Sequence, residues 1–206
     1  MNEPRLKLVS EPPRTDAPDD LALAKAAAAG DPEALSALLG RVFGRVRRTT
    51  SYLARCREDA EDSLQLALIE IARSIGGFRG ECPIEHWVDR IAVRTASEQL
   101  SKRRRREGLV AIAKEEPAAL PVPLDEAADR DRVRRRLAEI LSRLSPKNRT
   151  VLVLHYAWGY GVAEIARIVE CKENTVRGRV RQGRKQLKRE ILEDPVLSSW
   201  IERRRS

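Results

Sequence analysis

Residues 162–187, VAEIARIVECKENTVRGRVRQGRKQL, predict a short helix, a tight turn and a longer helix. Ala166, position 170 and Val176 have the spacing of a helix-turn-helix, in which a small residue lets two helices cross closely. The longer helix gathers its apolar residues in one stripe at about 100° per residue, namely Val176, Val180, Gly183, Leu187 and Ile191. Most of its basic residues fall on the opposite side. A helix that lies in a DNA groove requires this segregation, and the alternative is a charged, solvated face on an ordinary helix.

The basic side of this helix offers two kinds of DNA contact. Asn174, Arg177 and Arg181 are expected nearest the base edges, because Asn can pair with adenine and Arg with guanine. Contacts to phosphates position a protein on DNA without specifying the sequence. The residues expected to make them are Lys172, Arg179, Arg184, Lys185 and Lys188.

The charge of the chain is unevenly distributed. The 206 residues carry a net charge of +9, which favours a polyanionic partner. Residues 25–106 and 132–206 are basic, whereas residues 107–131 hold 2 basic and 7 acidic residues. This distribution indicates two DNA-facing modules joined by an acidic connector.

The sequence lacks the constellations that enzymes and metalloproteins use. Cys56, Cys82 and Cys171 are far apart and show no metal-ligand spacing. We find no Gly-rich phosphate loop and no paired nucleophile and base, so we expect no catalysis, no metal and no cofactor. The chain opens with no signal peptide and holds no run of about 18 apolar residues. These observations favour a cytoplasmic protein without membrane insertion.

Composition and periodicity predict an all-α fold of two small helical domains joined by a flexible linker. Aromatic residues make up only 4% of the chain, and its Ala, Leu, Arg and Glu favour helix. Asp31-Pro32 and Ser145-Pro146 are typical helix starts. The expected parts are a disordered arm (1–20), a first domain (21–106), a linker (107–131), a second domain (132–193) and a C-terminal tail (194–206).

A wider pattern surrounds the helix-turn-helix in residues 144–190. It comprises Leu144, Pro146, Arg149, Val151, Leu152, Leu154, Tyr156, Gly159, Glu164-Ile165-Ala166 and Thr175-Val176. This pattern resembles region 4 of bacterial sigma factors, the module that reads the −35 promoter element. The resemblance adds Thr175 to the expected DNA contacts.

The first domain carries three further segments. These are AGDPEAL (29–35), DAEDSLQ (59–65) and FRGECPIEHWVDRIA (78–92). They resemble region 2 of the same family. Two such blocks, in this order and without an intervening region 3, are similar to the extracytoplasmic-function (ECF, group 4) class over about residues 21–192.

The resemblance implies a role for each block. The polymerase-docking segment, which would contact the β′ coiled coil, contains Asp59, Asp62, Gln65 and Leu66. The −10 segment, which would capture unpaired bases, contains Phe78, Arg79, Gly80, Trp87, Arg90 and Arg94, although Trp87 could equally be a core anchor. The implied partners are core RNA polymerase (β′ coiled coil and β flap), double-stranded promoter DNA, unpaired −10 bases and an anti-sigma factor.

Several residues depart from the family pattern. Glu170 and Lys172 stand where the motif usually has a turn glycine and a capping serine, so we expect a positive φ and a missing cap. Each costs on the order of 1 kcal/mol. Arg94 replaces a frequent Asn, and Leu66 a frequent Glu. These departures predict an unusual promoter and an altered polymerase contact.

The function implied by the resemblance is that of an alternative sigma factor. It would bind core RNA polymerase and direct promoter-specific initiation at −35 and −10 elements. The alternatives are a sigma mimic that binds an anti-sigma factor and a conventional helix-turn-helix operator-binding regulator. The basic stripe argues against the mimic, and the segments at 59–65 and 78–92 argue against the simple regulator.

Overall fold

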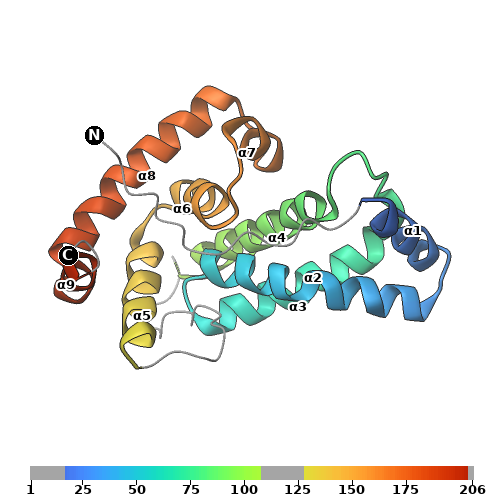
Figure 1. Cartoon of the computed structure of the whole chain (residues 1–206), viewed down its shortest axis with the longest axis horizontal. Coiled ribbons are helices and arrows are strands. Elements are labelled where there is room, and N and C mark those ends of the chain that lie inside the picture. The colour runs from blue at the N-terminus through green and yellow to red at the C-terminus, as the bar shows by residue number, and fades with distance from the viewer. Residues whose placement is uncertain (1–16, 108–127, 204–206) are drawn as a thin grey trace. The chain divides into compact units, whose positions relative to one another are not determined.

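The computed structural model describes residues 17–107 and 128–203, which form helices and, within those ranges, no strand. The chain divides into two compact units (Figure 1), one containing α1 to α4 and the other α5 to α9. The prediction of an all-α fold with two helical domains is confirmed.

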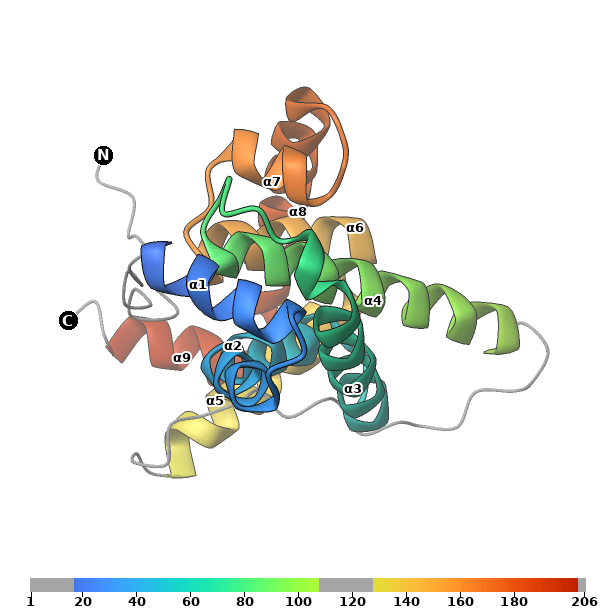
Figure 2. The same cartoon turned by 90° about the vertical axis from the view of Figure 1, so that its right-hand side faces the viewer.

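The first unit is built around α2. Its elements are α1 (Ala17–Ala28), α2 (Pro32–Leu53), α3 (Arg57–Ser74), the short 3₁₀ helix η1 (Ile75–Gly77) and α4 (Ile84–Glu107). Figure 2 views α2 nearly end-on, with α1, α3 and α4 packed around it. Leu38, Val46, Ile71 and Val88 are almost fully buried where these helices meet, so the apolar stripes of three helices close one core.

The start of α2 follows from Asp31 and Pro32. The Asp31 carboxylate accepts hydrogen bonds from the backbone N–H groups of Glu33 (2.9 Å) and Ala34 (3.1 Å). Pro32 needs no hydrogen-bond partner at the first helical position, where an N–H would be unpaired anyway. The predicted cap is confirmed.

A buried ion pair joins α2 to α4. The Arg45 guanidinium donates to Asp89 Oδ2 from Nε (3.0 Å) and from its Nη2 (2.7 Å), and the Thr49 hydroxyl donates to Asp89 Oδ1 (3.1 Å). The Asp89 side chain is 0% exposed. Burying a charge is costly unless it is paired and hydrogen-bonded, so these contacts fix the rotation of α4 against α2.

The second unit is organised along one long helix, α8. Its elements are α5 (Ala128–Arg143), α6 (Pro146–Leu152), the π-helical turn η2 (Val153–Ala157), α7 (Val162–Ile168), α8 (Glu173–Glu193) and α9 (Pro195–Arg203). In Figure 1, α7 lies at the N-terminal end of α8, while α5 and α9 lie at its C-terminal end. Ile140, Leu144, Leu152 and Leu197 form the buried core between them.

The last helix is anchored by Asp194. Its Oδ1 accepts hydrogen bonds from the N–H groups of Val196 and Leu197, both at 3.0 Å, and so caps α9. Its Oδ2 pairs with Arg136 of α5 at 2.6 Å. Burial acts to raise the pKa of Asp194, but the backbone hydrogen bond from Leu197 and the Arg136 charge outweigh it, and the net pKa lies below its ordinary value.

Three element boundaries differ from the sequence expectation. Helix α1 begins at Ala17 rather than near residue 21, and the rest of the expected arm lies outside the described residues. Helix α5 begins at Ala128, so the last four residues of the expected linker are helical. The expected C-terminal tail contains α9, which contributes the buried Leu197. Asp20 of α1 and Leu197 of α9 are buried, so tertiary packing stabilises the first and the last of these extensions.

Candidate nucleic-acid interface

The turn between α7 and α8 is closed by a residue in the left-handed conformation. Glu170 has a φ of 51°, and the N–H of Cys171 donates to the carbonyl of Ala166 at 3.0 Å. This is the longer bond of a Schellman motif, in which the left-handed position is usually glycine. The positive φ expected at Glu170 is confirmed, and the turn forms despite a cost on the order of 1 kcal/mol.

Helix α8 begins without a side-chain cap. Lys172 occupies the cap position in an extended conformation, and its side chain makes no capping hydrogen bond. The missing cap expected from the sequence is therefore confirmed. Glu173 in the first turn places a negative charge at the positive end of the helix dipole, which offsets part of this loss.

The apolar side of α8 is fixed against α7 and α6. Val176 is fully buried, as is Ile165 of α7. Gly183 allows close approach to α6, because a Cβ at this position would lie 2.9 Å from Leu152 Cδ1. The predicted stripe is the buried side of the helix, so the orientation of α8 about its axis is set by these contacts.

The opposite side of α8 is basic and open to solvent. The exposed residues of the predicted DNA face are Lys172, Asn174, Thr175, Arg177, Arg181, Arg184, Lys185 and Lys188. Arg179 is half-buried, and its Nη1 lies 3.7 Å from the Cys171 sulfur. The structure thus brings the predicted contacts together on one helix. Arg179 differs from the others because its side chain lies against the α7–α8 turn.

Arg177 is held by two residues of its own helix. Its Nη2 pairs with Glu173 Oε2 at 2.9 Å, and its Nη1 donates to Asn174 Oδ1 at 3.0 Å. The pairing of Glu173 with Arg177 was not among the expectations from the sequence. The signal was present, because a Glu four residues before an Arg is a favourable helical pair.

The predicted polymerase-docking segment has an inner and an outer part. Asp62, Gln65 and Leu66 are exposed on α3, with the apolar Ile69 beside them on the surface. Asp59 does not lie with them. Its carboxylate pairs with Arg103 of α4 at 2.7 Å and is only 12% exposed.

The cysteine that precedes α3 belongs to the same inner cluster. The Arg103 Nη1 also lies 3.0 Å from the sulfur of Cys56, and burial raises the pKa of this thiol. Arg103 belongs to a run of five basic residues, 102–106. In the structure it ties the end of α4 to the start of α3.

The predicted −10 segment is partly core. Phe78 is buried and its ring centroid lies 5.7 Å from that of the half-buried Trp87. Arg79, Gly80, Arg90 and Arg94 are exposed. Gly80 has a φ of 72°, and Arg94 pairs with Glu70 of α3 at 2.8 Å. The aromatic pair supports the loop from the inside, while the cationic residues face solvent.

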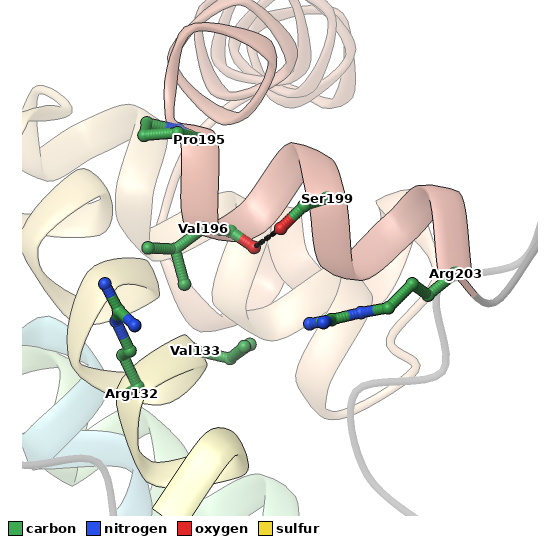
Figure 3. Close-up of a pocket in the computed structure, with 6 residues that line it drawn as sticks. All are labelled: Arg132, Val133, Pro195, Val196, Ser199 and Arg203. Carbon is green, nitrogen blue, oxygen red and sulfur yellow. Dashed lines mark hydrogen bonds between the residues drawn. The ribbon is translucent and has the colours of Figure 1, made fainter.

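A shallow hollow lies between α5 and α9 in the second unit (Figure 3). It has a volume of about 250 Å³ and is lined by Arg132, Val133, Pro195, Val196, Ser199 and Arg203. The Ser199 hydroxyl donates to the carbonyl of Val196 at 3.1 Å. None of these lining residues is a carboxylate, His or Cys that could act as a base toward the Ser199 hydroxyl.

Residues 17–107 and 128–203 contain no group of three or more His, Cys, Asp or Glu placed to hold a metal ion. None of the helices in these ranges is both long enough and apolar enough to cross a membrane. A two-unit helical protein with a basic helix-turn-helix is the class that this fold and surface define.

Comparison with known proteins gives the family. Residues 134–187 match the family described as Sigma-70, region 4. The chain is 31% identical over 173 residues to the ECF RNA polymerase sigma factor SigM of Mycobacterium tuberculosis, an alignment that covers 82% of this chain and 83% of SigM. It is 29% identical over 182 residues to the ECF RNA polymerase sigma-E factor of Haemophilus influenzae, covering 84% and 95% of the two chains.

Solved structures show the same fold. The sigma factor RpoE of Bartonella quintana, crystallised with the anti-sigma factor NepR, matches with a TM-score of 0.64 at 22% identity, covering 76% of this chain and 95% of that one. CnrH, solved with the cytosolic domain of CnrY, matches with a TM-score of 0.59 at 22% identity, covering 87% and 99%. The chain belongs to the ECF family of RNA polymerase sigma factors, which are transcription initiation factors.

Proposed function

We propose that the two units divide promoter recognition between them. Residues 21–106 of the first unit form region 2, which binds core RNA polymerase and opens the −10 element. Residues 132–193 of the second unit form region 4, which binds the −35 element. The observation that carries this proposal is the basic, exposed side of α8 opposite its buried Val176 stripe, in a chain of the ECF family.

For the −35 element we propose that the first turns of α8 enter the major groove. Asn174, Arg177 and Arg181 are exposed on those turns and have the donor groups that read base edges. The remaining exposed residues contact phosphates and position the helix; they are Lys172, Thr175, Arg184, Lys185 and Lys188. Arg179 contributes by supporting the turn through Cys171.

For the −10 element we propose a cationic surface formed by Arg79, Arg90 and Arg94. These exposed guanidinium groups provide the positive potential that single-stranded DNA needs. Gly80 lets the loop turn with its positive φ. Phe78, buried against Trp87, holds the loop in place rather than stacking on an unpaired base.

For the polymerase we propose a contact through the outer face of α3. Asp62 and Gln65 supply polar groups there, and Leu66 and Ile69, which are 40% and 46% exposed, supply apolar area. Exposed apolar residues rimmed by polar ones are typical of protein interfaces. Asp59 supports this face from within through Arg103.

Under this assignment the protein is not an enzyme, because nucleotide addition would belong to the polymerase that it binds. We also propose a cytoplasmic location. We also propose an anti-sigma partner, since the RpoE structure of similar fold contains one. The β flap of the polymerase is the proposed site for the second unit.

Run-off transcription tests this function. Core polymerase is given genomic promoter fragments with and without the protein, and core binding is measured separately by gel filtration. We expect specific transcripts only in the presence of the protein. Absence of both specific initiation and core binding contradicts the proposal.

A further inference from the structure

We propose that Glu173 and Asn174 are positioning residues that hold Arg177 ready to recognise one guanine of the −35 element. The inference rests on the proposed function and adds to it the means by which one base pair is selected. Its basis is the pair of contacts at 2.9 Å and 3.0 Å from Arg177 to these two residues. The two acceptors engage different terminal nitrogens of one guanidinium, so together they restrict both its position and the direction of its plane.

The restriction matters because Arg177 is otherwise a mobile surface side chain. It is 60% exposed, and an Arg side chain carries about 2 kcal/mol of rotamer entropy. Part of that entropy must be lost before the guanidinium can pair with a base. Arg181, one turn further along the exposed side, has no side-chain partner among the described residues. Arg177 is therefore the better prepared of the two for a directed contact.

The contacts leave Arg177 able to bind a base. A guanidinium has five N–H donors, and Glu173 and Asn174 each accept a single hydrogen bond from it. The remaining donors suffice for the two parallel bonds that Arg makes to guanine O6 and N7. The neighbours therefore orient the group without consuming its recognition capacity.

The charge of Glu173 points the same way. It is the sole acidic residue in the segment 171–189, which also carries eight basic residues. A carboxylate on a DNA-facing helix weakens binding to every sequence through repulsion of phosphates. Its contact with Arg177 compensates for this weaker binding by increasing the discrimination between DNA sequences, on which promoter recognition depends.

The test is a selection experiment with holoenzyme assembled from core polymerase and the full chain. The probe is a library of DNA duplexes with a randomised segment at the −35 position, and enrichment of each base is read by sequencing. For the unchanged protein we expect a guanine-preferring position that Arg177→Ala abolishes. Glu173→Ala should lower the guanine preference at that same position about 5-fold or more, the lower end of what a bidentate Arg–guanine pair provides.

Three further variants separate orientation from charge. Glu173→Gln keeps an acceptor for Arg177 without the charge, so it should bind all duplexes more tightly and keep the preference within about 2-fold, well inside the range of one bidentate contact. Asn174→Ala removes the second acceptor and should also lower the preference at this position, and a change that it causes at a second position reports the base contact proposed for Asn174 itself. Glu193→Ala removes an exposed carboxylate from the other end of α8 and should leave it unchanged. Helical circular dichroism verifies that each variant folds.

Each outcome has a defined meaning. If the unchanged holoenzyme enriches no sequence, the proposed function itself is contradicted. If it does, and Glu173→Ala keeps the preference that Arg177→Ala loses, the positioning role is overturned. If Glu173→Ala changes the base preference at a different base pair, the positioning role is also overturned, because Glu173 would then contact DNA directly. Should Glu173→Ala fail to fold, retention of the preference in Asn174→Ala or its loss in Glu173→Gln would overturn the inference.

Discussion

Helix α8 contains two glycines whose replacement by alanine should have different effects on stability. A Cβ at Gly178 would meet no atom within 4 Å, whereas a Cβ at Gly183 would lie 2.9 Å from Leu152 Cδ1 and 3.1 Å from its Cγ. Gly178→Ala should therefore stabilise the second unit by about 0.5 to 1 kcal/mol, the gain in helix propensity. Gly183→Ala receives the same gain but overpacks the contact with α6.

The magnitude follows from comparing the two variants, because the propensity gain cancels between them. Overpacking a closed contact costs about 1 to 3 kcal/mol, and Leu152 is only 2% exposed, so its side chain has little room to move. Gly183→Ala should thus be less stable than Gly178→Ala by about 1 to 3 kcal/mol. The shift would also lift α8 away from α6, so binding to a −35 duplex should weaken.

Hydrogen–deuterium exchange measures this locally. Peptides covering α6 and α8 should exchange faster in Gly183→Ala than in Gly178→Ala, while peptides of the first unit serve as an internal control. Equal protection of α6 and α8 in the two variants would refute the reasoning, since it would show that the approach to Leu152 does not limit the packing.

Three other predictions concern charged residues. Because the pKa of folded Asp194 is lowered, its ionised carboxylate stabilises the fold above the ordinary pKa of about 3.9, and this stabilisation is lost as the pH falls through the lower folded pKa. The midpoint of acid unfolding of the second unit should therefore shift to higher pH in Asp194→Asn. An unchanged midpoint contradicts this. Asp89→Asn leaves the Arg45 charge buried without its full partner and should cost about 3 to 5 kcal/mol in urea unfolding of the first unit; a loss below 1 kcal/mol would argue against the pair. Asp62→Ala should weaken core polymerase binding without changing thermal stability, whereas Asp59→Ala should lower thermal stability, and the reverse pattern would exchange their proposed roles.

Much of the fold could be predicted from local patterns. The cap at Asp31, the positive φ at Glu170 and the missing cap at Lys172 all depend on residues within a few positions of one another. The buried stripe headed by Val176 follows from helical periodicity. Such features are set mainly by the segment itself.

The features that were missed depend on contacts distant in sequence. Arg45 looks like a surface residue in a basic run, and only the approach of Asp89, 44 residues later, makes it a core residue. Arg103 likewise pairs with Asp59, which lies 44 residues earlier in the chain. Phe78 was expected among the base-capturing residues, and its own segment did not indicate that it would be buried against the half-buried Trp87. Periodicity does not identify such partners.

The anchoring of α9 also defines the smallest fragment of the second unit that is useful in experiments. A truncation at residue 187, where the Sigma-70, region 4 match ends, would remove Asp194 and Leu197. Arg136 would lose its ion-pair partner on Asp194, and the apolar groups around Ile140 would become exposed to solvent. Such a fragment invites aggregation, so a polypeptide for NMR or for isolated DNA-binding measurements should extend through Arg203.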